Sequence, residues 1–163
     1  MEFPRRKANR LKEFDYSTDG AYFVTICTKD RRCTLSTIVG DGFPIPKNKT
    51  LGKIAVQFIE LVTVKYPTVC VDKYVVMPNH IHMILFIDND KGGTGNPSPT
   101  LGNVIGWLKY NITKEYNKSQ TQKESVFQRS YYDHVIRCEK DYLEILEYIN
   151  NNPLNWQMDE LYS

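Results

Sequence analysis

The sequence predicts an α+β fold in which helices pack on a mostly antiparallel sheet. Short runs of β-branched and aromatic residues alternate with longer segments whose apolar residues recur at helical spacing. Short strands with helices segregated to a face of the sheet are typical of this fold class. The chain has 163 residues, 41% of them hydrophobic and 25% charged, which is enough to bury one core. We therefore expect a single domain over residues 1–163.

Four segments have the composition of β-strands, and turn residues separate them. Asp30-Arg31-Arg32 is a turn between the first two strands, and Pro78-Asn79 is a tight turn between the last two. Residues 40–50 and 88–98 contain several Gly, Pro and Asn residues, so they are predicted to be loops. The predicted strands cover residues 21–27, 33–39, 69–77 and 80–87.

Three helices are predicted from apolar residues that recur every three or four positions. The first helix begins near Leu51 and ends at Tyr66-Pro67, because proline disfavours helical geometry in the residue before it. The second has the same period from Leu101 to Ile112. The third runs from about residue 139 to residue 152. This order of strands and helices fits a split β-α-β arrangement of the ferredoxin-like kind.

The charge and cysteine patterns narrow the class of protein. The net charge is only +2, but basic residues are concentrated in an N-terminal arm, residues 1–15. Such an arm either neutralises phosphates or is a solvated basic tail.

No apolar run approaches the length of a membrane span and no secretory signal is visible, so we expect a cytoplasmic protein without a membrane partner. The four cysteines form no Cys-x-x-Cys pair, which argues against a zinc knuckle.

The most informative local pattern is the His80-Ile81-His82 segment. Alternate side chains of a strand point to the same face, so the two imidazoles should project together while Ile81 turns into the core. Two imidazoles on one face can be two ligands of a metal ion. An exposed or hydrogen-bonded histidine pair is the alternative. Asn152, on a helix packed against this face, could supply an oxygen as a third ligand.

Tyr148 lies one helical turn before Asn152, so both side chains share a face of the third helix. A phenol beside a divalent cation can attack a phosphodiester whose oxygen the cation polarises. The product would be a phosphotyrosine intermediate, which separates strand cleavage from rejoining. Spacing alone selects Tyr148 only weakly over the nearby Tyr131, Tyr132 and Tyr142.

The chain resembles the single-tyrosine HUH transposases, specifically the REP-associated tyrosine transposase group. Three stretches in the expected order carry the resemblance: residues 5–28, which include Arg5-Arg6-Lys7 and the strand-like run; Val75-Val76-Met77-Pro78-Asn79-His80-Ile81-His82; and residues 127–153, which include Phe127-Gln128-Arg129-Ser130-Tyr131-Tyr132 and Glu147-Tyr148-Ile149-Asn150-Asn151-Asn152-Pro153.

The resemblance implies a ferredoxin-like HUH nuclease domain that cleaves single-stranded DNA, often at hairpins formed by palindromes. His80 and His82 would be metal ligands, Tyr148 the nucleophile that forms a 5′-phosphotyrosine bond, and Asn152 the third ligand. Related insertion-sequence enzymes usually have Gln in place of Asn152. The cation would be Mg²⁺ or Mn²⁺. His134 either orients the C-terminal helix or contributes to DNA binding or proton transfer. The residues expected to contact DNA are Arg5, Arg6, Lys7, Arg10, Lys12, Gln128, Arg129 and Arg137.

Two other functions remain open from the sequence. One is a non-catalytic protein, descended from a transposase, that binds DNA hairpins. The other is a rolling-circle replication initiator or relaxase-like nuclease, although such proteins usually have further domains and a different motif order. Related transposases occur as homodimers or monomers, and the sequence does not decide between these two states.

Overall fold

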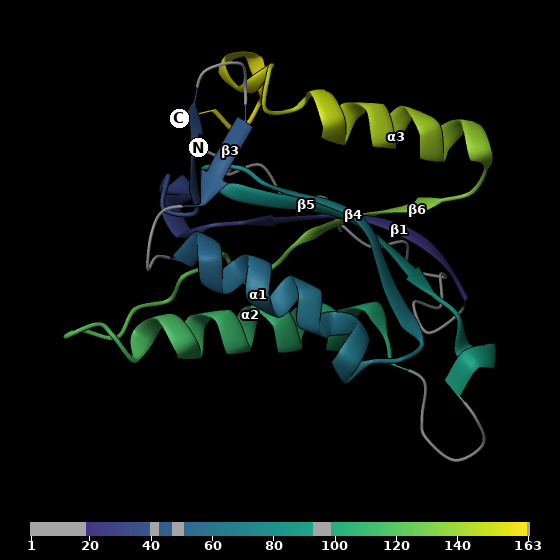
Figure 1. Cartoon of the computed structure of the whole chain (residues 1–163), viewed down its shortest axis with the longest axis horizontal. Coiled ribbons are helices and arrows are strands. Elements are labelled where there is room, and N and C mark those ends of the chain that lie inside the picture. The colour runs from purple at the N-terminus through teal and green to yellow at the C-terminus, as the bar shows by residue number, and fades with distance from the viewer. Residues whose placement is uncertain (1–18, 40–42, 47–50, 93–98, 163) are drawn as a thin grey trace, which may run out of the picture.

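A four-stranded antiparallel sheet forms the centre of the molecule (Figure 1). The computed structural model describes residues 19–39, 43–46, 51–92 and 99–162. Neighbouring strands of the sheet pair in the order β4-β5-β1-β6, so β4 and β6 are its edges. The strands are β1 (Gly20–Cys27), β4 (Val69–Val76), β5 (His80–Ile87) and β6 (Tyr132–Ile136).

Helices cover both faces of this sheet. The helices α1 (Leu51–Lys65) and α2 (Leu101–Asn117) lie on one face, and α3 (Glu139–Asn151) lies on the other (Figure 1). The predicted α+β class with an antiparallel sheet is confirmed. The four sheet strands and the first two helices follow one another as β-α-β-β-α-β. Short 3-10 turns lie in two connections, at Lys29–Arg31 and Asn89–Gly92, and in the segment after α3, at Trp156–Met158.

Three local predictions differ from the structure. The strand predicted at 33–39 begins only at Ser36, as β2 (Ser36–Val39). The loop predicted at 40–50 contains β3 (Phe43–Pro46), which pairs with β2 in a separate two-stranded sheet. Prolines are tolerated in this small sheet because one side of each of its strands needs no hydrogen-bonding partner. The sequence reading also missed β6, which pairs with β1 along the edge of the main sheet.

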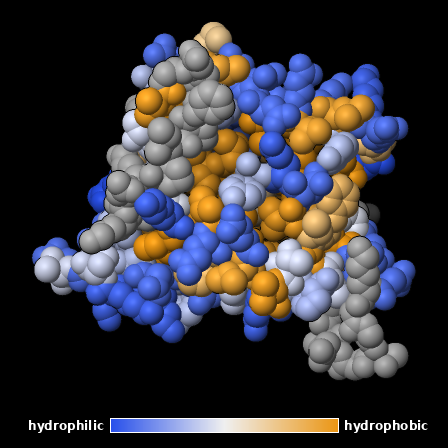
Figure 2. Space-filling view, viewed as in Figure 1, coloured by the Kyte–Doolittle hydropathy of each residue, from blue (hydrophilic) through white to orange (hydrophobic). Residues whose placement is uncertain are grey.

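The side chains of β5 divide between two apolar clusters, one on each face of the sheet. Ile81, Met83 and Leu85 are fully buried in the larger cluster, together with the apolar faces of α1 and α2. Ile84 turns the other way and packs with Ile149 of α3. Apolar side chains gather across the middle of the molecule, between the helices on either side (Figure 2). Because α3 seals the second face, polar side chains of β5 on that face are buried.

Among the described residues, no helix has the length and hydropathy needed to cross a lipid bilayer.

The core on the α1 and α2 face should determine stability. Leu85 is fully buried on a central strand, so Leu85→Ala should lower the free energy of unfolding by about 2–5 kcal/mol. Val64→Ala on α1 is a matched control, because its side chain is 74% exposed and the change should stay within about 0.5 kcal/mol. Urea unfolding followed by circular dichroism measures both. Equal effects of the two changes would contradict this description of the core.

Candidate active site

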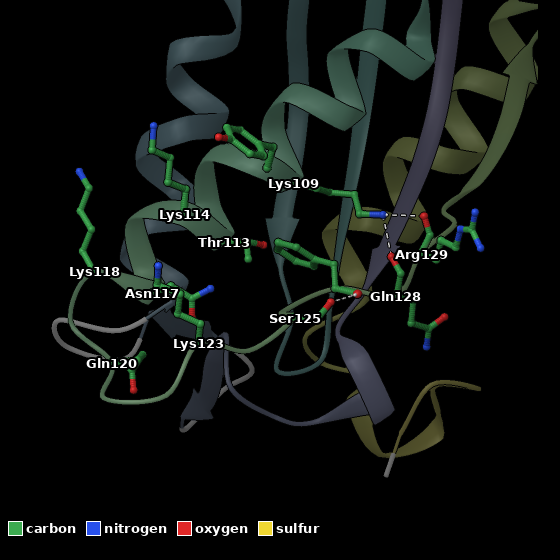
Figure 3. Close-up of a pocket in the computed structure, with 12 residues that line it drawn as sticks. Lys109, Thr113, Lys114, Asn117, Lys118, Gln120, Lys123, Ser125, Gln128 and Arg129 are labelled. Atoms are coloured by element: carbon green, nitrogen blue, oxygen red, sulfur yellow. Dashed lines mark hydrogen bonds between the residues drawn. The ribbon is translucent and has the colours of Figure 1, made fainter.

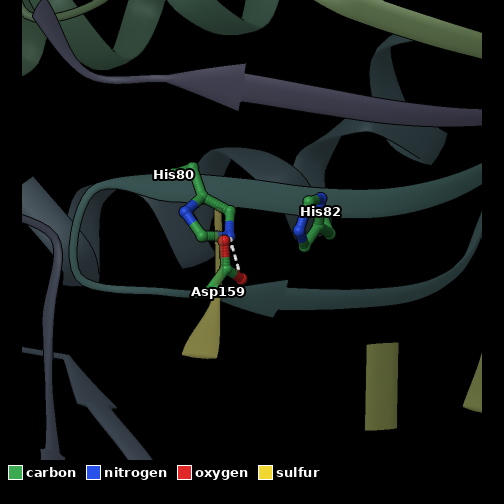
Figure 4. A group of neighbouring side chains, drawn as sticks. All are labelled: His80, His82 and Asp159. Carbon is green, nitrogen blue, oxygen red and sulfur yellow. Dashed lines mark ion pairs between the residues drawn. The ribbon is translucent and has the colours of Figure 1, made fainter. Parts of the chain in front are cut away.

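His80 and His82 project from β5 toward α3, as their spacing predicts. The residue between them, Ile81, is buried in the opposite cluster. The imidazole rings lie with their centroids 4.4 Å apart, and the two residues are only 0% and 2% exposed. Figure 4 shows both rings leaving the same strand on the same side. The exposed histidine pair that the sequence left possible is therefore excluded.

A hydrogen bond to the side-chain oxygen of Asn79 orients the first imidazole. The Asn79 side-chain amide nitrogen donates to the carbonyls of Leu161 at 2.6 Å and Arg31 at 3.4 Å, so its oxygen points the other way. That oxygen lies 2.8 Å from His80 Nδ1 and can only accept. His80 therefore carries its proton on Nδ1. Its Nε2 has a lone pair available for a cation, the usual arrangement of a metal-binding histidine.

A hydrogen bond with Thr25 orients the second imidazole. Thr25 Oγ1 lies 2.8 Å from His82 Nδ1, and Thr25 is opposite His82 in the β1–β5 pairing. When the hydroxyl accepts from Nδ1, the lone pair of His82 resides on Nε2. That nitrogen faces the hydroxyl of Tyr148 at 3.5 Å. The sheet register thus determines the direction of this ring.

Burial keeps both imidazoles uncharged. It lowers the pKa of His80 to about 4, although the Asp159 carboxylate and the neighbouring Asn152 side chain act in the opposite direction. Burial also lowers the pKa of His82 well below its usual value, and the neighbouring His80 lowers it further. Both rings are therefore neutral near pH 7. Neutral imidazole is the form that binds metal ions.

Two buried acceptor atoms beside this pair have no hydrogen-bond partner among the described residues. They are His80 Nε2 and the side-chain oxygen of Asn152. An unsatisfied buried polar atom typically costs about 1–3 kcal/mol. Asn152 is 3% exposed at the end of α3, and its amide nitrogen donates to Asp159 Oδ2 at 2.7 Å. The amide is thereby oriented with its oxygen left as an unused acceptor.

Asp159 belongs to the same cluster, although the sequence analysis did not identify it. Its side chain is 2% exposed, and Oδ2 lies 3.9 Å from His80 Nε2 (Figure 4). Ligand atoms of His80, His82 and Asp159 all lie within 4.8 Å of one another. Two neutral imidazoles and a carboxylate form a possible metal site, and the donor atoms suit a divalent cation such as Mn²⁺. No periodic pattern or motif singles out Asp159, which comes after α3 in the C-terminal segment.

Tyr148 borders both the histidine pair and solvent. Its ring lies 5.3 Å from the His82 ring and 6.1 Å from that of Phe23, centroid to centroid. The residue is 46% exposed and lines a hollow of about 290 Å³ on α3 and the residues after it. Burial raises the pKa of Tyr148, as do Asp159 and the neighbouring Glu160, whereas a hydrogen bond with Asn152 lowers it. The phenol is therefore protonated near pH 7.

The three competing tyrosines lie elsewhere. Tyr142 donates its hydroxyl proton to Asp72 on β4, at 2.7 Å. Tyr131 is buried in the core on the α1 and α2 face. Tyr132 is 49% exposed on the edge strand β6. Of these four tyrosines, Tyr148 is the one whose hydroxyl meets the histidine pair.

The remaining predicted site residues are divided among three places. His134 on β6 lies 2.8 Å from Asp141 on α3, a contact that links the edge strand to the helix. The backbone nitrogen of Arg137 donates to the same carboxylate at 3.4 Å. Gln128 and Arg129 lie in the segment before β6, where Lys109 of α2 donates to both of their carbonyls. Five predicted DNA contacts lie outside the described residues: Arg5, Arg6, Lys7, Arg10 and Lys12.

No protein-family model matches the chain. The chain is 35% identical over 171 residues to an uncharacterised protein of Haemophilus influenzae, with 96% of this chain and 93% of that protein covered. A second H. influenzae protein, provisionally named a REP-associated tyrosine transposase, is 25% identical over 150 residues. That match covers 86% of this chain and 73% of the relative.

The fold also has a counterpart among solved structures. A REP-associated tyrosine transposase bound to a REP hairpin matches with a TM-score of 0.59 and 20% sequence identity. The match covers 93% of this chain and 77% of that one. At this identity the likeness concerns the fold, and it agrees with the relationship found by sequence. By sequence, and with a fold that agrees, this chain is related to the REP-associated tyrosine transposases.

Proposed function

We propose that this chain is a ferredoxin-like HUH nuclease domain that cleaves and rejoins single-stranded DNA through a 5′-phosphotyrosine intermediate. The proposal rests mainly on one contact: the hydroxyl of the half-exposed Tyr148 lies 3.5 Å from Nε2 of His82, which is next to the buried His80. The substrate is DNA with hairpins formed by palindromic repeats, and the outcome is transposition or repeat processing. The whole chain acts as one domain, as a monomer or homodimer.

His80, His82 and Asn152 would hold a divalent cation, Mg²⁺ or Mn²⁺, with Asp159 as a further oxygen ligand. The two buried acceptor atoms without a hydrogen-bond partner, His80 Nε2 and the Asn152 side-chain oxygen, fit such a cation because both could bind it. Imidazole ligation favours Mn²⁺ in vitro, whereas availability favours Mg²⁺ in cells. When bound, the cation would polarise a phosphodiester oxygen and stabilise the charge that develops there.

The chemical step belongs to Tyr148. Its phenolic oxygen forms a bond to phosphorus while the bond from phosphorus to the 3′-oxygen breaks. The phenol loses its proton to solvent, and the departing 3′-oxygen becomes a hydroxyl by gaining one. The phosphodiester is thereby exchanged for a phosphotyrosine of similar energy, so a 3′-hydroxyl can later reverse the reaction. During this step, hydrogen bonds with Asn79 and Thr25 keep the imidazoles of His80 and His82 in their orientations.

Tyr148→Phe should abolish the covalent product, because it removes only the attacking oxygen. Denaturing gels with labelled single-stranded hairpin DNA and Mn²⁺ would show a metal-dependent protein–DNA adduct in the unchanged chain and none in the variant. Tyr110→Phe is the control, since this tyrosine is also exposed and lies on α2, on the opposite face of the sheet from the histidines. An adduct that persists in Tyr148→Phe would show that another group is the nucleophile.

His80→Ala and His82→Ala should each weaken Mn²⁺ binding by at least about 100-fold, because each removes a direct ligand. Titration calorimetry on the protein without DNA measures this affinity independently of catalysis. His134→Ala serves as the control, because His134 contacts Asp141 instead of the buried pair. Unchanged Mn²⁺ affinity in both test variants would refute the proposed metal site.

Asp159→Asn should weaken Mn²⁺ binding by about 10–100-fold, since it removes a buried negative charge while keeping the side-chain shape. Asn152→Ala should have an effect of similar size, because it removes the unused amide oxygen. Glu160→Gln, which makes the same change of charge at an exposed neighbour, should leave the affinity within about twofold. If Asp159→Asn behaves like Glu160→Gln, the ligand set reduces to the two histidines and Asn152.

If tight hairpin binding occurs without any adduct, with both metals and many oligonucleotides, the chain is instead a non-catalytic hairpin-binding protein. That is the second candidate function.

A further inference from the structure

The hollow beside Tyr148 differs in its lining from the larger groove on the other face of the sheet. That groove, of about 780 Å³, lies between α2 and the segment before β6, and its charged lining residues are four lysines and one arginine (Figure 3). The hollow, of about 290 Å³, is lined among the described residues by carboxylates and amides besides the Tyr148 phenol. Its lining therefore suits hydrogen bonding better than phosphate binding, since carboxylates repel phosphates. These lining residues are Glu144, Glu147, Asn151, Asn152 and Asn155.

The hollow follows one flank of α3, and this flank faces the edge strand β6. The lining residues recur every three or four positions from Glu144 onward. The backbone nitrogen of Asn155 donates to the carbonyl of Asn151 at 3.1 Å, so the turn continues beyond the end of the helix. Asp141, one turn before Glu144, is on the same flank, and its carboxylate lies 2.8 Å from His134 of β6. This contact shows which way the flank faces.

Tyr132 exposes an aromatic ring on the surface of the sheet that this flank faces. Tyr132 and His134 alternate along β6, so their side chains point to the same face. In the sheet register, Tyr132 is opposite Thr25, and Thr25 is opposite His82. Neighbours across paired strands lie about 4.5–5.5 Å apart between Cβ atoms, so Tyr132 is two such steps from His82. Because Tyr132 is 49% exposed, much of its ring is free to contact a ligand.

The ring and the hollow together suit an unpaired base. Bases stack on exposed aromatic rings whatever their sequence. A glutamate accepts a hydrogen bond from the exocyclic amine of cytosine, whereas thymine has a carbonyl oxygen at that place and would set one acceptor against another. One acceptor of the lining, the side-chain oxygen of Asn152, is buried without a hydrogen-bond partner among the described residues. The hollow thus ends at a group that still needs a donor or a cation.

We propose that the space between this flank of α3 and β6 receives the unpaired base next to the phosphate that Tyr148 attacks, and that it prefers a base with an exocyclic amine. The proposal rests on the proposed function and deepens it, because it names what determines base selectivity at the same site. Tyr132 stacks on the face of the base, while Glu144 and Glu147 accept hydrogen bonds from its edge. Since Tyr148 lines the same hollow, binding of the base brings the neighbouring phosphate to the phenol.

Stacking is tested with Tyr132→Ala and Tyr132→Phe in the full chain. Fluorescence anisotropy would measure the Kd for labelled oligodeoxycytidine of about 12 nucleotides, within the usual range of single-strand sites. Tyr132→Ala should weaken binding by about 5–150-fold, whereas Tyr132→Phe, which keeps the ring, should stay within about twofold of the unchanged chain. Unchanged affinity in Tyr132→Ala would overturn the stacking role. So would equal losses in the two variants, which would indicate that the hydroxyl binds DNA instead.

Base selectivity is tested by comparing oligodeoxycytidine with oligodeoxythymidine of equal length, because these pyrimidines differ at the exocyclic amine. The unchanged chain should bind the cytosine strand about 10-fold more tightly. Glu144→Gln and Glu147→Gln combined should reduce this ratio below about threefold, since an amide can also donate to thymine. The control combines Glu60→Gln and Glu139→Gln, two exposed glutamates outside the hollow, and removes the same charge. It should preserve the ratio.

A ratio near one in the unchanged chain, or equal ratios in the two double variants, would overturn the base preference. The covalent adduct of the unchanged chain is scored separately, with hairpin DNA and Mn²⁺. A preference that depends on the two glutamates of the hollow, together with no adduct, would leave the base site standing and contradict the proposed nuclease. An adduct formed by a chain that binds both oligonucleotides equally would do the reverse.

Discussion

The hydrogen bond between the Asn79 side chain and His80 is the constraint on which the site depends. It determines which nitrogen of the imidazole carries the proton, and hence which nitrogen has the lone pair. The same side chain holds the carbonyl of Leu161, so the turn between β4 and β5 also anchors the C-terminal segment that contains Asp159. One amide thus links the direction of the ring to the position of the carboxylate.

The histidine pair could be predicted from sequence because it depends only on the two-residue repeat of a strand. The end of the first helix could be predicted for a similar reason, since Pro67 acts on its immediate neighbour. Asp159 could not, because its role arises from a contact with His80, distant in the chain, and from burial under the C-terminal segment. The strand β6 was missed because its five residues carry a weak local signal and depend on pairing with β1.

The assignment of Tyr148 could be predicted only in part. Its helical position beside Asn152 followed from the spacing of the residues, but the same reasoning left three other tyrosines as competitors. The structure separates them by their partners: a carboxylate for Tyr142, the core for Tyr131, the sheet edge for Tyr132 and a buried imidazole for Tyr148.

The histidines and Tyr148 belong to elements that differ in how firmly they are packed into the fold. The histidines belong to a central strand with paired neighbours on both sides, whereas α3, which carries Tyr148, has a single fully buried residue, Ile149. Elements with little buried apolar surface open at lower free energy than core strands. Amide hydrogens of α3 would therefore exchange with solvent sooner than those of β5. Separation of the tyrosine from the imidazoles is then a local opening event, which requires no unfolding of the sheet.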